Sequence, residues 1–198
     1  MRETELVEHV QSAAHARSML TTQGRVLRLI ATGKPFETVL QAFIDAVETH
    51  CAGAMGSVLL MDDDGEHLRH GRAPRLPDEY NRMVDGLRIG PRAGSCGTAA
   101  YRGEPVIVED ISTSSLWVDY LDVAARFRLG ACWSHPILST GRRVLGTLAI
   151  YATQAMFHEV SYSPLDNALV FFLAGIASGL AVNQRAAATI PPQPAATA

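Results

Sequence analysis

The chain has 198 residues, 47% of them hydrophobic, and a formal net charge of −3 with a pI near 6.1. This length predicts about one domain, and the apolar share is sufficient for a full hydrophobic core. The slightly acidic balance argues against a nucleic-acid-binding surface, although sixteen arginines beside the single Lys34 leave room for local contacts with anions.

The sequence carries no pattern typical of secretion, membrane insertion or metal binding. Residues 1–11 include three glutamates where a signal peptide has an apolar core. The longest apolar run, residues 168–182, has 15 residues, short of the roughly 20 that cross a bilayer. Cys51, Cys96 and Cys132 are odd in number and lack CxxC spacing, which favours neither a disulfide framework nor a zinc site. We therefore expect a cytoplasmic protein that contacts no membrane.

Two helices are expected in the first quarter of the chain. Residues 2–32 predict one long helix, which Gly24 can interrupt and which Gly33 and Pro35 end. The second helix begins at Phe36, because its apolar residues recur at steps of three and four and place one stripe toward a core. These residues are Phe36, Val39, Leu40, Phe43, Ile44 and Val47.

A strand pair and a short helix are expected next. Residues 57–62 predict a strand that turns at Asp63-Asp64-Gly65 and pairs with residues 66–73. The turn lacks the twelfth-position glutamate of a calcium loop, so a hairpin explains it. Pro77, followed by two acidic residues, predicts a helix that extends to about Val84.

The stretch from Gly90 to Tyr151 contains most of the reactive side chains. Residues 94–100 predict a glycine-rich turn into a helix, with Ser95 accepting hydrogen bonds from amides two or three residues later. Three β-branched runs predict neighbouring antiparallel strands, the last two joined by a turn at residues 139–142. These runs are 106–108, 131–137 and 145–151. Between the first two, residues 116–127 have helical spacing, and Asp110 is expected to cap the turn that begins at Ser112.

The C-terminal part predicts a helix and a tail. Ser163-Pro164-Leu165-Asp166 resembles a capping box, and the helix that follows has two apolar stripes. Because the sheet can cover only one stripe, we expect a homodimer through the N- and C-terminal helices; the alternative is a monomer in which the N-terminal helix folds back over the C-terminal one. The Ala/Pro-rich residues from Ala186 onward predict a disordered tail or the beginning of a linker.

Seven segments of the central region share their order and residues with one known family. They are Ser57–Asp62 before Asp64-Gly65, Ala73-Pro74 with Leu76-Pro77, Gly94–Ala100, Val106–Ile111, Leu116-Trp117, Gly130–Ile137 and Leu145–Tyr151. Over roughly residues 36–187 the chain thereby resembles the GAF domain family, the small-molecule sensor domains of bacterial signalling proteins. The resemblance does not identify a ligand, because this fold binds cyclic nucleotides, haem, bilins, nitrate and other small molecules.

The resemblance implies an α+β fold with α/β/α layers. We expect a central antiparallel sheet of about six strands, with the N- and C-terminal helices on one face and short helices and loops over a ligand pocket on the other. Residues 1–33 would be a dimerisation and signalling helix, residues 34–187 the GAF domain, and residues 188–198 the tail.

The resemblance also places a ligand pocket between the sheet and the segment that crosses over it. The implied ligand-binding residues are Ser95, Cys96, Gly97, Thr98, Trp117, Tyr120, Ala124, Cys132, Trp133 and His135. Trp117, Tyr120 and Trp133 would form an aromatic wall. Strand alternation predicts that Trp133 and His135 share one face, opposite Cys132 and Ser134, so Cys132 and His135 cannot bind one metal together.

A sensor function follows from this expectation. Amides at residues 96–98 favour a small anion such as nitrate, with Arg92 nearby, and the aromatic wall favours a flat organic ligand. Ligand occupancy would pass through the terminal helices to a signalling partner such as a histidine kinase. We assign no catalytic residue and no metal site.

Three alternatives stay open. A thiol at a helix start suits a redox enzyme of the free methionine sulfoxide reductase type that uses Cys96. That family needs a second cysteine in the loop that closes the pocket, and residues 110–127 contain none. His135 as an axial ligand would make the protein a haem-binding gas or redox sensor. The last alternative is a dimerisation module without a ligand.

Overall fold

The computed structural model describes residues 3–51 and 53–153. Its centre is a sheet of antiparallel strands. Six strands form one sheet in the order β3-β2-β1-β6-β5-β4. The strands are β1 (Met55–Met61), β2 (His67–Arg72), β3 (Leu87–Arg88), β4 (Val106–Val108), β5 (Ala131–Leu138) and β6 (Val144–Ala152). The helices are α1 (Glu3–Ala31), α2 (Phe36–His50), α3 (Asp78–Val84), α4 (Gly94–Arg102) and α5 (Leu121–Arg126), with 3₁₀ turns η1 (Ile111–Thr113) and η2 (Val118–Tyr120).

The expected hairpins and strand neighbours are confirmed. β5 and β6 pair antiparallel through a turn in which Arg142 adopts a φ of 60°, and β4 pairs antiparallel with the other edge of β5. β1 pairs with both β2 and β6, which places it near the centre of the sheet. The Asp64 carboxylate accepts hydrogen bonds from backbone amides at the β1–β2 turn, as a hairpin requires.

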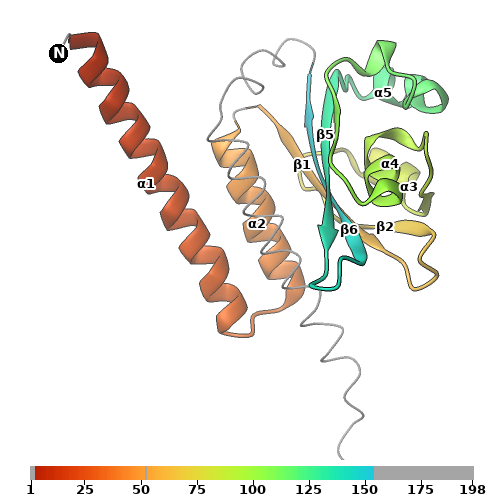
Figure 1. Ribbon diagram of the computed structural model, residues 1–198, viewed down its shortest axis with the longest axis horizontal. Coiled ribbons are helices and arrows are strands. Elements are labelled where there is room, and N and C mark those ends of the chain that lie inside the picture. The colour runs from red at the N-terminus through yellow and green to blue at the C-terminus, as the bar shows by residue number, and fades with distance from the viewer. Residues whose placement is uncertain (1–2, 52, 154–198) are drawn as a thin grey trace, which may run out of the picture.

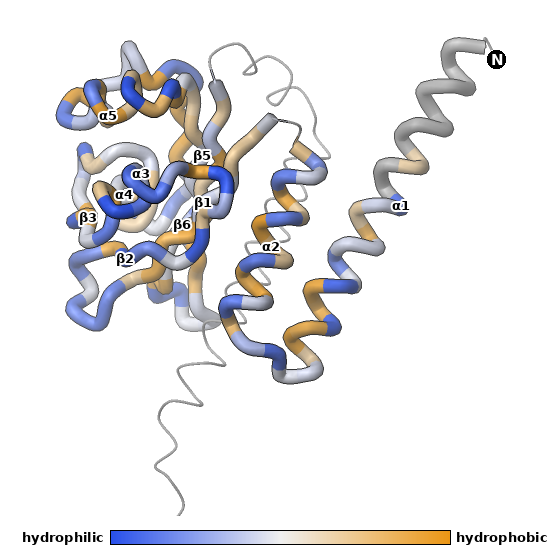
Figure 2. Tube along the Cα trace, turned by 180° about the vertical axis from the view of Figure 1, so that it is seen from behind, coloured by the Kyte–Doolittle hydropathy of each residue, from blue (hydrophilic) through white to orange (hydrophobic). Residues whose placement is uncertain are grey.

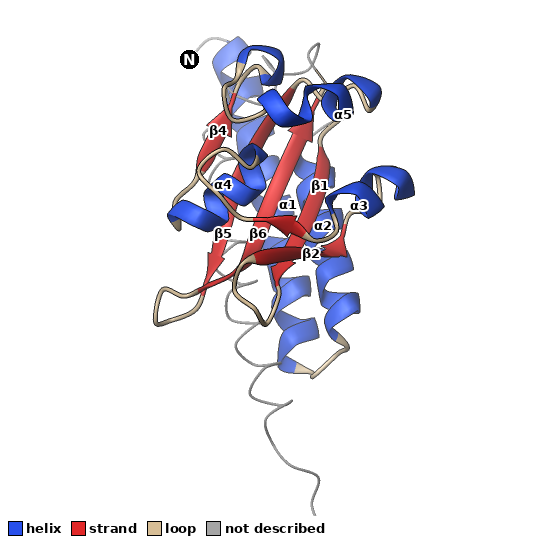
Figure 3. Ribbon diagram, turned by 90° about the vertical axis from the view of Figure 1, so that its right-hand side faces the viewer, coloured by secondary structure: helices blue, strands red, loops and turns tan. Residues whose placement is uncertain are grey.

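The sheet separates two helical layers (Figures 1 and 3). α1 and α2 lie on one face, and α3, α4 and α5 lie on the other. The α2 layer buries Phe43, Ile44 and Trp133, whereas the opposite layer buries Tyr80 and Tyr151 among other residues. The predicted α+β class and layered sheet are therefore confirmed for the described residues.

The two N-terminal helices follow the predicted pattern. α1 runs through Gly24 without interruption, and α2 turns its apolar stripe toward the sheet (Figure 2). The helices pack together where Val26 of α1 meets Val39 and Ala42 of α2. Within the described ranges, no helix combines the length and the apolar character that a membrane span needs.

Two local expectations are wrong. Residues 116–127 form the 3₁₀ turn η2 and the six-residue helix α5 rather than one helix. Ser95 does not cap α4: the helix begins at Gly94 with a φ of 60°, and Thr98 Oγ1 accepts from the Ala93 amide at 3.2 Å. The expected Asp110 cap is confirmed, because its carboxylate accepts from the Ser112 amide.

The predictions for the C-terminal helix, its two stripes and the tail concern residues 154–198, which lie outside the described residues.

Candidate ligand cavity

A cavity of about 210 Å³ lies on the α3–α5 side of the sheet. Its wall comes from β1, β6, α3, the first turn of α4 and the crossing segment around η2. The lining residues are Leu59, Tyr80, Met83, Val84, Leu87, Ala93, Gly94, Ser95, Cys96, Trp117, Tyr120, Val123 and Tyr151. The volume exceeds the roughly 150 Å³ of an engineered cavity that binds benzene and is below the roughly 300 Å³ of typical small-molecule pockets. It therefore suits a compact guest.

The cavity wall is largely aromatic. Tyr80 and Trp117 each meet Tyr151 edge-to-face, with ring centroids 5.8 and 6.5 Å apart, and Trp117 meets Tyr120 at 6.3 Å. No Asp, Glu, Lys, Arg or His is among the described residues that line it, so its ionisable side chains are Cys96 and the tyrosines. Polar contacts can come from the Ser95 hydroxyl, the Cys96 thiol and the tyrosine hydroxyls. Such a wall favours a neutral guest with a flat apolar face.

Two hydrogen bonds hold the crossing segment to α4. The Trp117 indole Nε1 donates to Ser95 Oγ at 3.0 Å, and the Gly94 amide donates to the Leu116 carbonyl at 3.0 Å. Because the indole occupies one lone pair of Ser95, the Ser95 proton stays available for another acceptor. Trp117 is almost fully buried, so its position depends on this contact as well as on packing.

An ion pair joins the two sides of the cavity at the surface. Arg126 of α5 donates to Glu79 of α3 at 2.6 Å, and both side chains are about half exposed. Such an exposed pair contributes at most about 1 kcal/mol to stability. The Tyr80 ring of α3 also meets the Phe127 ring just after α5 edge-to-face, with ring centroids 5.4 Å apart.

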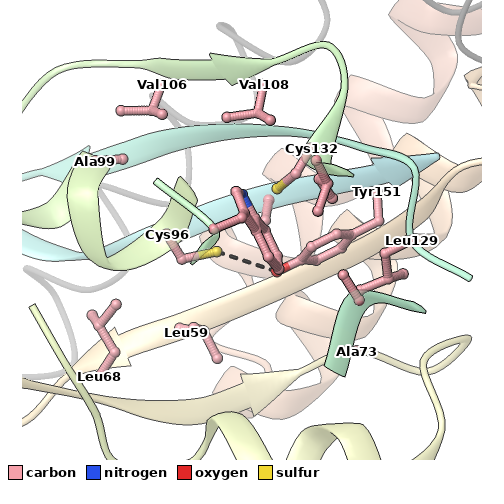
Figure 4. Packing of buried hydrophobic residues seen from close by; sticks show 14 of the residues in the cluster. Leu59, Leu68, Ala73, Cys96, Ala99, Val106, Val108, Leu129, Cys132 and Tyr151 are labelled. Atoms are coloured by element: carbon pink, nitrogen blue, oxygen red, sulfur yellow. Dashed lines mark hydrogen bonds between the residues drawn. The ribbon is translucent and has the colours of Figure 1, made fainter. Parts of the chain in front are cut away.

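A buried thiol–phenol chain forms the floor of the cavity. The Tyr80 hydroxyl donates to the Tyr151 hydroxyl at 2.9 Å, and Tyr151 shares a 3.4 Å hydrogen bond with Cys96 Sγ. Cys132 of β5 is the cross-strand partner of Tyr151, and the side chains of Cys96, Cys132 and Tyr151 turn toward one another in Figure 4. All three cysteines are free thiols.

This environment distinguishes the two thiols. The neighbouring Cys132 thiol, opposed by burial and aided by Tyr151, lowers the pKa of Cys96 to about 7. Burial raises the pKa of Cys132 well above its usual value. The buried Ser134 and Thr147 hydroxyls have no hydrogen-bond partner within residues 3–51 and 53–153, and both favour the thiolate of Cys96. Cys96 is therefore the more acidic thiol of the pair.

The structure brings only part of the predicted pocket together. Ser95, Cys96, Trp117 and Tyr120 line the cavity. The other residues predicted on the same side are buried behind its wall: Gly97, Thr98, Ala124 and Cys132.

Trp133 and His135 do not belong to this wall, which corrects the predicted aromatic wall. Trp133 packs in the α2 layer with Phe43 and Ile44, and strand alternation places His135 on the same face. Burial lowers the pKa of His135, so the neutral imidazole is favoured there. A haem held by His135 would consequently lie on the opposite face from the cavity. Among the described residues, no three His, Cys, Asp or Glu side chains gather as a metal site.

The sequence-based prediction missed the α3 and β6 sides of the cavity. Tyr80 and Met83 come from the seven-residue helix α3, which is too short to show an apolar stripe, and Tyr151 comes from β6. One signal was present: Tyr151 alternates with Ala149 and is the cross-strand partner of Cys132. The pairing of β5 with β6 would therefore have placed Tyr151 beside that thiol.

Comparison with known proteins agrees with this architecture. The chain is 32% identical over 167 residues to the methyl sulfide methyltransferase-associated sensor of Methanosarcina acetivorans; the match covers 82% of this chain and 16% of that protein. The chain thus spans about a sixth of that relative's length.

Two solved structures share the fold. The GAF domain of a phosphoenolpyruvate-protein phosphotransferase from Coxiella burnetii has a TM-score of 0.69 at 18% identity, covering 88% of this chain and 99% of that one. Free methionine-R-sulfoxide reductase from Neisseria meningitidis, in complex with its substrate, has a TM-score of 0.65 at 17% identity, covering 89% and 93%. The GAF domain family model matches residues 33–182. This chain therefore belongs to the GAF domain family.

Proposed function

We propose that this GAF domain is a sensor that binds a compact, uncharged and flat molecule in the cavity beneath Trp117 and transmits occupancy to a signalling partner. The observation that carries the proposal is the aromatic cavity wall, in which no Asp, Glu, Lys, Arg or His is found among the described lining residues. The crossing segment around η2 closes this cavity and is held to α4 by the Trp117–Ser95 hydrogen bond. The resemblance to a protein described as a sensor supports the signalling role.

A neutral guest is favoured over the anion considered from the sequence. Arg92, the expected cation, is exposed in the loop before α4 and does not line the cavity. The first turn of α4 does line it at Gly94, Ser95 and Cys96, and its amides are partly positive. These groups suit the carbonyl or ring nitrogen of a neutral molecule, because an unpaired anion in an apolar cavity would retain most of its desolvation cost.

Ligand occupancy can be coupled to the rest of the protein through the crossing segment around η2, which carries Trp117. A guest that contacts Trp117 more favourably in one arrangement of the crossing segment shifts the population toward that arrangement. The proposed output route passes to α1, where Leu20 and Leu27 are 68% and 46% exposed. We propose that this face of α1 contributes to a homodimer, and that a histidine kinase or another output protein receives the signal.

Two tryptophans on opposite faces make the binding proposal testable by NMR. The chain has two indole N–H signals, one from Trp117 and one from Trp133, which Trp→Phe variants assign. We expect neutral benzene-sized probes such as benzamide and nicotinamide to shift the Trp117 signal, while the Trp133 signal stays in place. Sodium nitrate should leave both unchanged.

The contrary outcomes are equally clear. A shift of Trp133 alone, or a nitrate response at Trp117 stronger than that of the neutral probes, would contradict the proposed guest. Native mass spectrometry of protein purified without added ligand provides a second reading. A cavity that is empty there and that no neutral probe enters would favour the ligand-free dimerisation module.

A second candidate function rests on Cys96, whose acidic thiol lines the cavity. A thiolate in this position suits a reductase acting on free methionine sulfoxide, with a dithiol as the final reductant. The test is turnover of that substrate with dithiothreitol. Turnover lost in Cys96→Ser and kept in Cys51→Ser would support the enzyme, whereas no turnover by the unmodified protein would support the sensor.

A further inference from the structure

Two cysteines, Cys96 and Cys132, are buried in the same cluster on the cavity side of the sheet. The two thiols come from α4 and β5, and α4 packs directly on β5 beneath the crossing segment. Cys132 is the cross-strand partner of Tyr151, whose hydroxyl contacts Cys96. The tertiary fold thus brings together two sulfurs that are 36 residues apart in the sequence.

The two sulfurs differ in access. Cys96 lines the cavity, so a small molecule that enters the cavity can reach it. Cys132 is fully buried and is not among the lining residues, so a guest in the cavity meets Cys96 first. This is the arrangement of an attacking thiol backed by a resolving thiol.

Their surroundings support the same assignment of roles. The groups that face Cys96 are Cys132 on β5, Tyr151 on β6, the Ser134 and Thr147 hydroxyls of the sheet, and Tyr80 behind Tyr151. Because Tyr80 donates to Tyr151, the Tyr151 proton is free to point at Cys96. Together with the adjacent thiol this favours a Cys96 thiolate, the reactive form of the pair.

We propose that Cys96 and Cys132 form a reversible disulfide when a small peroxide enters the cavity. In the first step the Cys96 thiolate attacks one peroxide oxygen, the S–O bond forms, the O–O bond breaks, and water or an alcohol leaves after gaining a proton. In the second step the Cys132 sulfur attacks the sulfur of the Cys96 sulfenic acid. The S–S bond forms, the S–O bond breaks, and the hydroxide leaves as water with the Cys132 proton. Two thiols are oxidised by two electrons, and one peroxide is reduced.

The disulfide would change the cavity wall. Its sulfur can no longer act as a thiolate acceptor for Tyr151, and α4 becomes covalently tied to β5. The first turn of α4 carries Ser95, which accepts the hydrogen bond from Trp117. The oxidation state of the two cysteines would therefore shift the position of the crossing segment, as a bound guest would.

Peptide mapping after peroxide treatment tests this directly on the full chain. The native protein is treated with hydrogen peroxide, its remaining thiols are alkylated, and trypsin then releases Cys96 in residues 93–102 and Cys132 in residues 129–142. We expect these peptides to be cross-linked and to separate after dithiothreitol. Cys51, also buried but in the α2 layer, is the internal control. It should react at least roughly tenfold more slowly, because it does not line the cavity that the peroxide enters, whereas the thiolate of Cys96 is favoured there.

Two variants separate the steps. In Cys132→Ser, Cys96 should stop at the sulfenic acid, which dimedone traps; in Cys96→Ser, Cys132 should stay a free thiol. Sulfinic acid at Cys96 without a cross-link in the native protein would overturn the proposal. So would three unreacted thiols, or oxidation of Cys51 at an equal rate. The NMR experiment uses reduced protein, so its result does not depend on this one.

Discussion

At the residue scale, the acidic thiol of Cys96 is the most distinctive chemical feature of the described structure. A fully buried thiol in apolar surroundings would normally have a raised pKa, as Cys132 has. Cys96 departs from this rule because the Cys132 thiol and the Tyr151 hydroxyl both favour its charged form. The contrast comes from hydrogen bonding rather than from a difference in burial, since both side chains are buried to a similar extent.

The first prediction concerns the pH dependence of this thiol. A lowered pKa means that the thiolate appears at lower pH, so alkylation of Cys96 by iodoacetamide should rise with a midpoint near pH 7 instead of the roughly 8.5 of an ordinary thiol. Tyr151→Phe removes one group that favours the thiolate and should move the midpoint upward. Mass spectrometry of peptide 93–102 measures both profiles. A native midpoint at or above 8.5, or a downward shift in Tyr151→Phe, would contradict this account.

At the element scale, close packing of Ala93 against the first turns of α4 shapes one side of the cavity. A side chain at Gly97 would place its Cβ 2.6 Å from the Ala93 Cβ and 3.4 Å from the Arg88 carbonyl oxygen. A glycine at this position lets Ala93 approach the helix closely, beside Ser95 and Cys96, which line the cavity. Gly97 lies inside α4 and has an ordinary helical backbone, so glycine is needed there for the close approach of Ala93 and not for an unusual φ angle.

The second prediction compares two helical glycines. Gly97→Ala should destabilise the protein by about 1–3 kcal/mol through overpacking, and it should also move the Trp117 indole signal. Gly24→Ala in α1 is the matched control: no atom lies within 4 Å of its added Cβ, so it should stabilise by up to about 1 kcal/mol. Urea unfolding measures both values. Equal effects of the two substitutions would show that close packing at Gly97 does not matter.

At the scale of the whole molecule, the two faces of the sheet differ: one is packed against α2, and the other borders the cavity. Its α2 face is filled by aliphatic and aromatic side chains, and its other face encloses the cavity and the thiol pair. α1 lies on the outer side of α2 (Figure 1), and its Leu20 and Leu27 are exposed. Exposed leucines on a long helix suit association with a second copy.

The third prediction is therefore a dimer that depends on α1. Replacing Leu20 and Leu27 together by glutamate should convert the dimer into a monomer, because four charges would face one another across the contact. The matched control is Tyr101→Glu, which changes an equally exposed apolar side chain on α4 and should leave the dimer intact. Analytical ultracentrifugation measures the mass. A native monomer, or a dimer that persists in the leucine variant, would contradict the proposal.

The sequence alone determined the local structure and the family. Helical periodicity located α2, turn residues located the β1–β2 and β5–β6 hairpins, and motifs in order indicated the GAF domain. Each of these signals is local: a repeat of 3.6, an alternation of two, or a residue type suited to a turn.

Only the tertiary structure decided which face of β5 turns toward the cavity side of the sheet and which thiols lie there together. Alternation separated Cys132 from Trp133, but β5 is buried on both faces, so its hydrophobicity could not show which side was which. Likewise, Tyr80, Cys96 and Tyr151 come from three different elements, and no spacing in the chain encodes their contact. The physical reason is that layer assignment and long-range contacts depend on how α3 and α4 pack on the sheet, which is a property of the whole fold.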